Sequence, residues 1–115
     1  PKEVPVTEEQ MNGIYADASR RKLGEKTFVD KCASCHAVDG GGTIGPNLTD
    51  HFWIHGKGTM IDILNVVSEG VLDKGMPPWK TMLKKEELQN VVAFVHSLLN
   101  TKPANPKAPQ GNEVK

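Results

Sequence analysis

Apolar positions in this chain recur with the period of an α-helix, and no stretch has a convincing strand pattern. The firmest example is predicted over residues 85–100. Its apolar residues fall at i, i+3, i+4, i+7, i+10 and i+11, which is one face of a helix. They are Leu88, Val91, Val92, Val95, Leu98 and Leu99, and Phe94 widens the face. The pattern predicts a C-terminal amphipathic helix that packs on the core.

Two helices are predicted in the N-terminal part of the chain. Thr7 followed by Gln10 is expected to cap a short helix that ends near Ala18. A firmer helix should cover residues 19–31. Its inward side chains are expected to be Leu23, Phe28 and Val29. Gly24 within this helix costs about 1 kcal/mol relative to alanine, so we expect another helix to cross closely at that position.

A further helix is predicted over residues 59–69, and Gly70 is a typical helix stop. Its inward side chains are expected to be Ile61, Leu64 and Val67, with Met60 beside them. Residues 39–43 and 45–48 have the composition of turns. The glycine run does not follow a strand, so it does not predict a nucleotide loop. The fold class is therefore predicted to be all-α, with four to five helices.

Three segments are expected along the chain. Residues 1–18 form an N-terminal lead-in with a short helix, and residues 19–100 form the domain. Residues 101–115 contain three prolines and no apolar period, which predicts an extended tail without a core of its own. No apolar run approaches the roughly 20 residues of a membrane span. Because Pro1 is not a natural translation start, we expect a mature or excised form.

The composition suggests that the core needs help from a bound group. Only 37% of the 115 residues are hydrophobic and 5% are aromatic. Small domains with so little apolar material commonly rely on a metal, a cofactor or a crosslink. The formal net charge is zero, which argues against a nucleic-acid-binding protein.

The sequence Cys32-Ala33-Ser34-Cys35-His36 is the attachment motif of a covalently bound c-type haem. A spacing of three puts both thiols on one side of a helical turn, where they can form thioethers with the porphyrin. The histidine that follows can then reach the iron. A zinc ribbon or a disulfide framework needs more than the two cysteines present. A thioredoxin-like pair would follow a strand, whereas a polar, helix-like stretch precedes Cys32.

Met76 is the preferred second ligand of the iron. Gly75 before it lets the backbone approach the ring, and Pro77 and Pro78 after it fix the loop. Met82 lies six positions further on and could replace it. The remaining candidates have other expected roles: Met11 and Met60 pack in the core, His51 and His55 contact a haem propionate or solvent, and His96 lies on the surface.

With these features the chain resembles the class I (monohaem) cytochrome c family over residues 23–99. The resemblance rests on Gly24, Phe28, the cysteine–histidine motif, and residues 45–48, 75–77 and 92–95. It implies the class I cytochrome c fold around one haem, in which the helix with Gly24 and Phe28 crosses the helix with Phe94. It also implies that the carbonyl of Pro46 accepts a hydrogen bond from the imidazole of His36.

Residues 45–56, 75–79 and 105–111 resemble more closely the cytochrome c subunit of cbb-type haem–copper oxidases. In that subunit two haem domains usually follow a membrane anchor, so this chain is either one such domain or a free periplasmic shuttle. The resemblance implies a site in the periplasm or on the outer face of the bacterial inner membrane. The implied haem-binding residues are Cys32, Cys35, His36, Pro46, Leu48, Trp53, Met76 and Trp79, with His36 and Met76 on the iron.

The expected function is one-electron transfer by a monomeric carrier, without catalysis of its own, between a donor and a terminal oxidase or another acceptor. Lysines near the predicted methionine ligand either meet an acidic partner or form an ordinary solvated surface. They are Lys74, Lys80, Lys84 and Lys85. Two alternatives remain: a haem enzyme or gas sensor with an open iron position, and a haem-free thiol–disulfide protein.

Overall fold

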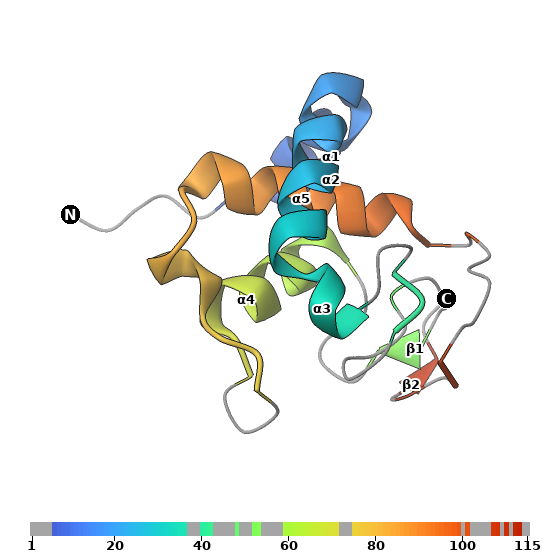
Figure 1. Ribbon diagram of the computed structural model, residues 1–115. Coiled ribbons are helices and arrows are strands. Elements are labelled where there is room, and N and C mark those ends of the chain that lie inside the picture. The colour runs from blue at the N-terminus through green and yellow to red at the C-terminus, as the bar shows by residue number, and fades with distance from the viewer. Residues whose placement is uncertain are drawn as a thin grey trace.

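The computed structural model describes residues 6–36, 40–42, 48, 52–53, 59–71, 75–99, 101, 107–108, 110 and 112–113. Within these ranges the chain forms five α-helices, one 3-10 turn and two very short strands (Figure 1). In chain order they are α1 (Glu8–Ala16), α2 (Ala18–Lys31), α3 (Ala33–His36), β1 (Phe52–Trp53), α4 (Met60–Glu69), η2 (Trp79–Thr81), α5 (Lys85–Ser97) and β2 (Asn112–Glu113). The fold is helical, as the periodicity predicts.

Helix α2 crosses α5 at Gly24, as expected from the glycine in its interior (Figure 1). Gly24 is buried, and a Cβ atom there would lie 2.0 Å from the carbonyl oxygen of Asn90 on α5. One turn further along α2, the rings of Phe28 and Phe94 pack with centroids 5.3 Å apart. The crossing of these two helices is therefore confirmed.

The core forms where α5 meets α1, α2 and α4. Its fully buried large side chains are Phe28, Met11, Met60, Val91 and Val92. The packing role expected for Met11 and Met60 is therefore confirmed. From α4 the buried side chains are Met60, Ile63 and Val67, whereas Ile61 and Leu64 are half-buried.

The prediction that Leu23 and Val29 turn inward is wrong, because their exposed fractions are 57% and 45%. Gly24 and Phe28 occupy the line of contact with α5. Neighbouring residues on a helix point about 100° apart. The residue before Gly24 and the residue after Phe28 are therefore rotated toward solvent.

Side chains cap the helices at the positions that the sequence indicates. The Thr7 hydroxyl accepts a hydrogen bond from the amide of Gln10, and the Gln10 side chain accepts one from the amide of Thr7. Glu8 on α1 accepts a hydrogen bond of 2.9 Å from the amide of Ile61, in the first turn of α4. This contact ties the N-terminal helix to the body of the domain.

Helix α5 begins without a short polar N-cap side chain, because Lys84 occupies the capping position. The amide of Lys84 instead donates a 2.9 Å hydrogen bond to the carboxylate of Glu87, three residues inside the helix. One of the amides that a helix start leaves without a partner is thereby satisfied.

The described part of the C-terminal tail returns to the segment that follows the cysteine–histidine motif. Strand β2 pairs antiparallel with β1, with Glu113 opposite Phe52 and Asn112 opposite Trp53. The amide of Lys107 also donates to the carbonyl of Gly41 at 2.8 Å. A two-residue pairing leaves no periodic signal in the sequence, so this contact could not be predicted. No helix in the described ranges has the length and apolar character needed to cross a bilayer.

Candidate functional site

The cysteine–histidine motif lies where α2 ends and α3 begins. The amide of Cys32 donates to the carbonyl of Phe28 at 2.8 Å, and the amide of His36 donates to the carbonyl of Cys32 at 3.0 Å. Both residues are half-buried. The side chain of Cys35 lies outside the described part of the chain, but its backbone belongs to α3. The motif backbone is therefore helical, as the spacing of three requires.

A glycine turn reverses the chain shortly after His36. The amide of Gly42 donates to the carbonyl of His36 at 2.9 Å, and the amide of Leu48 donates to the carbonyl of Gly40 at 2.7 Å. Gly40 and Gly42 have φ angles of 78° and 98°, which residues with a Cβ atom rarely adopt. Leu48 is part of the buried core.

Residues 75–79, the methionine segment, are joined to the end of α4 by their backbone. Val71 and Met76 form an isolated antiparallel bridge, with N–H to carbonyl distances of 2.8 and 3.0 Å. Gly75 has a φ angle of 85°, and a Cβ atom added there would meet nothing within 4 Å. Met76 and Trp79 are both half-buried and pack against the core cluster.

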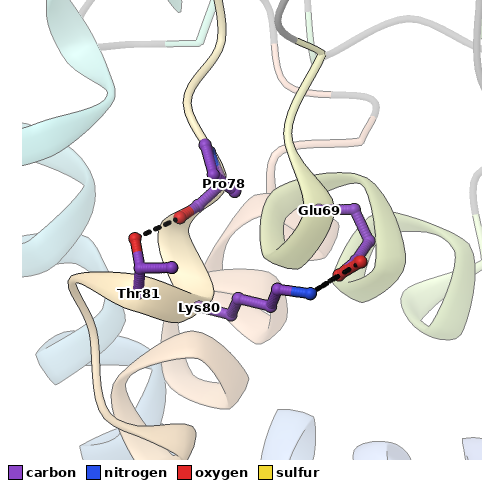
Figure 2. A network of polar contacts seen from close by, with 4 residues as sticks. All are labelled: Glu69, Pro78, Lys80 and Thr81. Carbon is purple, nitrogen blue, oxygen red and sulfur yellow. Dashed lines mark hydrogen bonds and ion pairs between the residues drawn. The ribbon is translucent and has the colours of Figure 1, made fainter.

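Two polar contacts fix the 3-10 turn that follows this segment (Figure 2). The Thr81 hydroxyl donates to the carbonyl of Pro78 at 3.0 Å. The Lys80 ammonium forms an ion pair with the carboxylate of Glu69, with N–O distances of 2.6 and 2.8 Å. One of the lysines expected to face a redox partner is thus already paired with a carboxylate of α4.

Residues far apart in the sequence pack against the same hydrophobic core cluster. Cys32 and Met76 both pack against it, and so does Trp79, while Leu48 is one of its members. Met82, the possible replacement ligand, has an exposed fraction of 53%. The predicted site residue Pro46, the side chain of Trp53, and both His51 and His55 lie outside the described part of the chain.

The side chains that could act as ligands fit a haem attached to the protein through its porphyrin ring. In the described ranges no group of three or more histidine, cysteine, aspartate or glutamate side chains could hold a bare metal ion. The motif instead provides two thiols and one imidazole, and the methionine segment provides one thioether. Two thiols can anchor a macrocycle, and one nitrogen with one sulfur is a ligand pair found on haem iron.

His96 was expected on the surface, but it is half-buried beside Tyr15. The two rings meet edge to face, with centroids 5.1 Å apart. The guanidinium of Arg21 lies 5.5 Å from the centre of the same tyrosine ring. His96 therefore helps to join α5 to α1, which is a packing role.

Gly70, which the sequence predicts only as a helix stop, also makes a contact near the site. Gly70 ends α4 with a φ angle of 73°, and its Cα lies against the backbone of Met76, Pro77 and Pro78. The signal for this contact is weak, because a glycine after a helix is common for local reasons alone.

Comparison with known proteins identifies the family. The model of the family described as cytochrome c oxidase, cbb3-type, subunit III, matches residues 19–95. A cbb3-type cytochrome c oxidase subunit CcoP of Rubrivivax gelatinosus is 37% identical over 104 residues, which cover 89% of this chain and 33% of that protein. The subunit CcoP of Cereibacter sphaeroides is 35% identical over 94 residues, covering 77% and 31%. The chain thus spans about a third of the length of these relatives.

A solved structure supports the fold. Cytochrome cL of the marine methylotroph Methylophaga aminisulfidivorans superposes with a TM-score of 0.70 at 23% sequence identity. The match covers 86% of this chain and 69% of that one. The class I cytochrome c fold expected from the sequence is therefore confirmed. Cytochromes c are the haem proteins of electron transport in respiratory chains, and this chain belongs to the cbb3-type cytochrome c oxidase subunit III family as a cytochrome c domain.

Proposed function

We propose that this chain is a one-electron carrier that holds one haem c through thioethers to Cys32 and Cys35, with His36 and Met76 as the ligands of its iron. When bound, the haem supplies a ferric–ferrous couple. The main structural support for this proposal is that Cys32 and Met76, which are distant in the sequence, pack against the same hydrophobic core cluster. Family membership and the helical backbone of the motif support it.

Each residue has a separate task in this proposal. The thiols would anchor the macrocycle, and the imidazole and thioether would hold the iron from two sides. The Val71–Met76 bridge holds the backbone of the methionine in place, which would keep reorganisation small when the iron gains or loses an electron. The methionine ligand raises the reduction potential relative to a second histidine. The carbonyl of Pro46 orients the imidazole, and Leu48, Trp53 and Trp79 line the haem.

In the whole protein we propose that this is an electron-carrying domain of a cbb3-type oxidase subunit, and the relatives favour this over a free shuttle. It takes electrons from a donor and passes them toward the terminal oxidase. Its site is the periplasm or the outer face of the bacterial inner membrane. On its own the chain is monomeric, and residues 19–100 form the domain between a lead-in and a tail.

Mass spectrometry of the denatured protein tests the covalent attachment. We expect a mass increment of one haem that survives denaturation. The Cys32→Ala and Cys35→Ala variants should each leave one thioether, and the double variant should lose the haem on denaturation. A colourless protein would favour the thiol–disulfide alternative. Rapid binding of carbon monoxide by the reduced protein would indicate an open iron position and favour a haem enzyme or gas sensor.

The lysines give a second test, of partner docking. Lys84 and Lys85 are exposed, so we propose that they meet an acidic face on the redox partner, with Lys80 contributing less because it is paired with Glu69. Charge reversal of Lys84 and Lys85 should slow electron transfer and flatten its dependence on salt. An unchanged rate and salt dependence would contradict docking through this surface.

A further inference from the structure

We propose that Gly70 is a positioning residue for the sulfur of Met76, because only a residue without a Cβ atom lets the methionine segment lie directly against the end of α4. This inference rests on the proposed role of Met76 as an iron ligand. It adds that the strength of the sulfur–iron bond depends on a residue that supplies no ligand to the iron.

The first observation is the contact at Gly70 itself. A Cβ atom there would lie 2.5 Å from the carbonyl carbon of Pro77, 2.6 Å from the nitrogen of Pro78 and 2.7 Å from the carbonyl oxygen of Met76. All three are backbone atoms, which cannot rotate away as the end of a flexible side chain can. Any side chain at position 70 must therefore displace the methionine segment or the end of α4.

The second observation is that the same segment is hydrogen-bonded to the residue after Gly70. The amide and carbonyl of Val71 bond to the carbonyl and amide of Met76 at 2.8 and 3.0 Å. A shift of the backbone at residues 76–78 would therefore strain this bridge as well. Because the sulfur sits on Met76, its position follows from the position of this short stretch of backbone.

The third observation is an exposed ion pair made by the residue that precedes Gly70. Glu69 precedes it and pairs with Lys80, while Thr81 bonds back to Pro78 (Figure 2). The lysine and glutamate side chains are 53% and 60% exposed, so this ion pair is weak compared with the direct backbone contact at Gly70. Three consecutive residues at and just after the end of α4 thus contact either the methionine segment or the 3-10 turn that continues from it, and Gly70 is the central one.

The test measures how readily a competing ligand displaces the sulfur. Imidazole, added to the ferric protein at a pH where it is neutral, replaces methionine on the iron, and the weak long-wavelength band of the sulfur–iron bond disappears. Its apparent affinity rises with the fraction of molecules in which the sulfur has left the iron. Gly70→Ala should raise that affinity by about tenfold or more and should lower the reduction potential.

Gly13→Ala is the control. Gly13 lies in α1, outside the methionine segment and the cysteine–histidine motif, and an added Cβ atom would meet nothing within 4 Å. It should therefore add the same methyl group without displacing the methionine segment. We expect its imidazole affinity to stay within about threefold of the unchanged protein. Equal effects of the two substitutions, or a Gly70→Ala protein with unchanged band, affinity and potential, would overturn the proposal.

If Gly70→Ala does not fold, a second pair of variants tests the contribution of the Lys80–Glu69 ion pair. Lys80→Gln removes the ion pair to Glu69, and Lys85→Gln removes the same charge from a neighbouring exposed position. Lys80→Gln should raise the imidazole affinity by about two- to fivefold, and Lys85→Gln should leave it unchanged. Equal affinities in these two variants would then overturn the proposal.

The test separates this inference from the proposed function. If the unchanged protein lacks the sulfur–iron band, the ligand assignment itself is wrong and the positioning role falls with it. If the band is present and Met76→Leu removes it, but Gly70→Ala behaves like Gly13→Ala, the ligand assignment stands and only the role of Gly70 is wrong.

Discussion

Gly24 on α2 and Asn90 on α5 lie so close that a Cβ atom on the glycine would be 2.0 Å from the asparagine carbonyl oxygen. The backbones of the two helices are therefore in direct contact at this point. Helix α2 leads into the cysteine–histidine motif, and α5 forms the centre of the core. The contact fixes the motif relative to the cluster against which Met76 also packs.

Replacing Gly24 should therefore weaken the whole domain. Gly24→Ala is expected to lower the free energy of unfolding by about 2 kcal/mol or more, because backbone atoms of Asn90 and Val91 must move. Urea unfolding followed by circular dichroism measures the change. Gly13→Ala is the control, since a Cβ atom there meets nothing within 4 Å. It should leave stability unchanged or raise it by up to about 1 kcal/mol; a similar loss in both variants would contradict the close crossing.

A hydrogen bond beside the crossing should contribute measurably to stability. Arg20 Nε donates to the side-chain oxygen of Asn90 at 2.6 Å, and Asn90 is buried. Asn90→Ala should lower the free energy of unfolding by about 1.5–3 kcal/mol, because it removes a hydrogen bond to a charged group. Gln89→Ala should change it by less than about 0.5 kcal/mol, since its contact with Arg20 is 3.4 Å long.

A double-mutant cycle isolates this pair from other effects of truncation. The Arg20→Ala and Asn90→Ala substitutions should be clearly non-additive, because each removes the same bond. Additive losses in the urea transitions would show that the two side chains do not interact in solution.

The pH dependence of stability should include a contribution from Asp17. A hydrogen bond from the Ser19 hydroxyl, with a further one from the amide of Arg20, lowers the pKa of this carboxyl below its ordinary value. A group with a lowered pKa in the folded state stabilises the protein above its ordinary pKa. That stabilisation is lost as the pH falls below about 4, through the folded value.

Asp17→Asn tests this titration, because asparagine can still cap α2 but carries no titratable proton. The fall in the free energy of unfolding on acidification should be smaller in this variant than in the unchanged protein. Identical pH profiles would contradict a lowered pKa at Asp17.

The sequence predicts the helices well because their determinants are local or periodic. The apolar face of residues 88–98, the Thr7–Gln10 cap and the stop at Gly70 each agree with the structure. Gly24 even indicated a contact with a distant helix, since a glycine inside a helix is costly without such a reason. The short strand pairing gave no signal, because two residues cannot show a period.

The errors and omissions near the site have a common physical origin in contacts that no periodic pattern specifies. Leu23 and Val29 were expected inside because of their apolar character, yet the contact with α5 follows Gly24 and Phe28. The motif identified the haem chemistry because that chemistry needs a fixed spacing. The contact of Gly70 with residues 76–78 depends on tertiary structure, so no local pattern in the sequence predicts it.

The long-wavelength absorption of the ferric protein most directly tests the ligation of the iron, in three forms: unchanged, Met76→Leu and Met82→Leu. We predict that the band of the sulfur–iron bond is present in the unchanged protein and in Met82→Leu, because Met82 is exposed. We predict that the band is lost in Met76→Leu, with a fall in reduction potential. A band that persists in Met76→Leu, or one that is missing from the unchanged protein, would contradict the ligation of the iron by His36 and Met76.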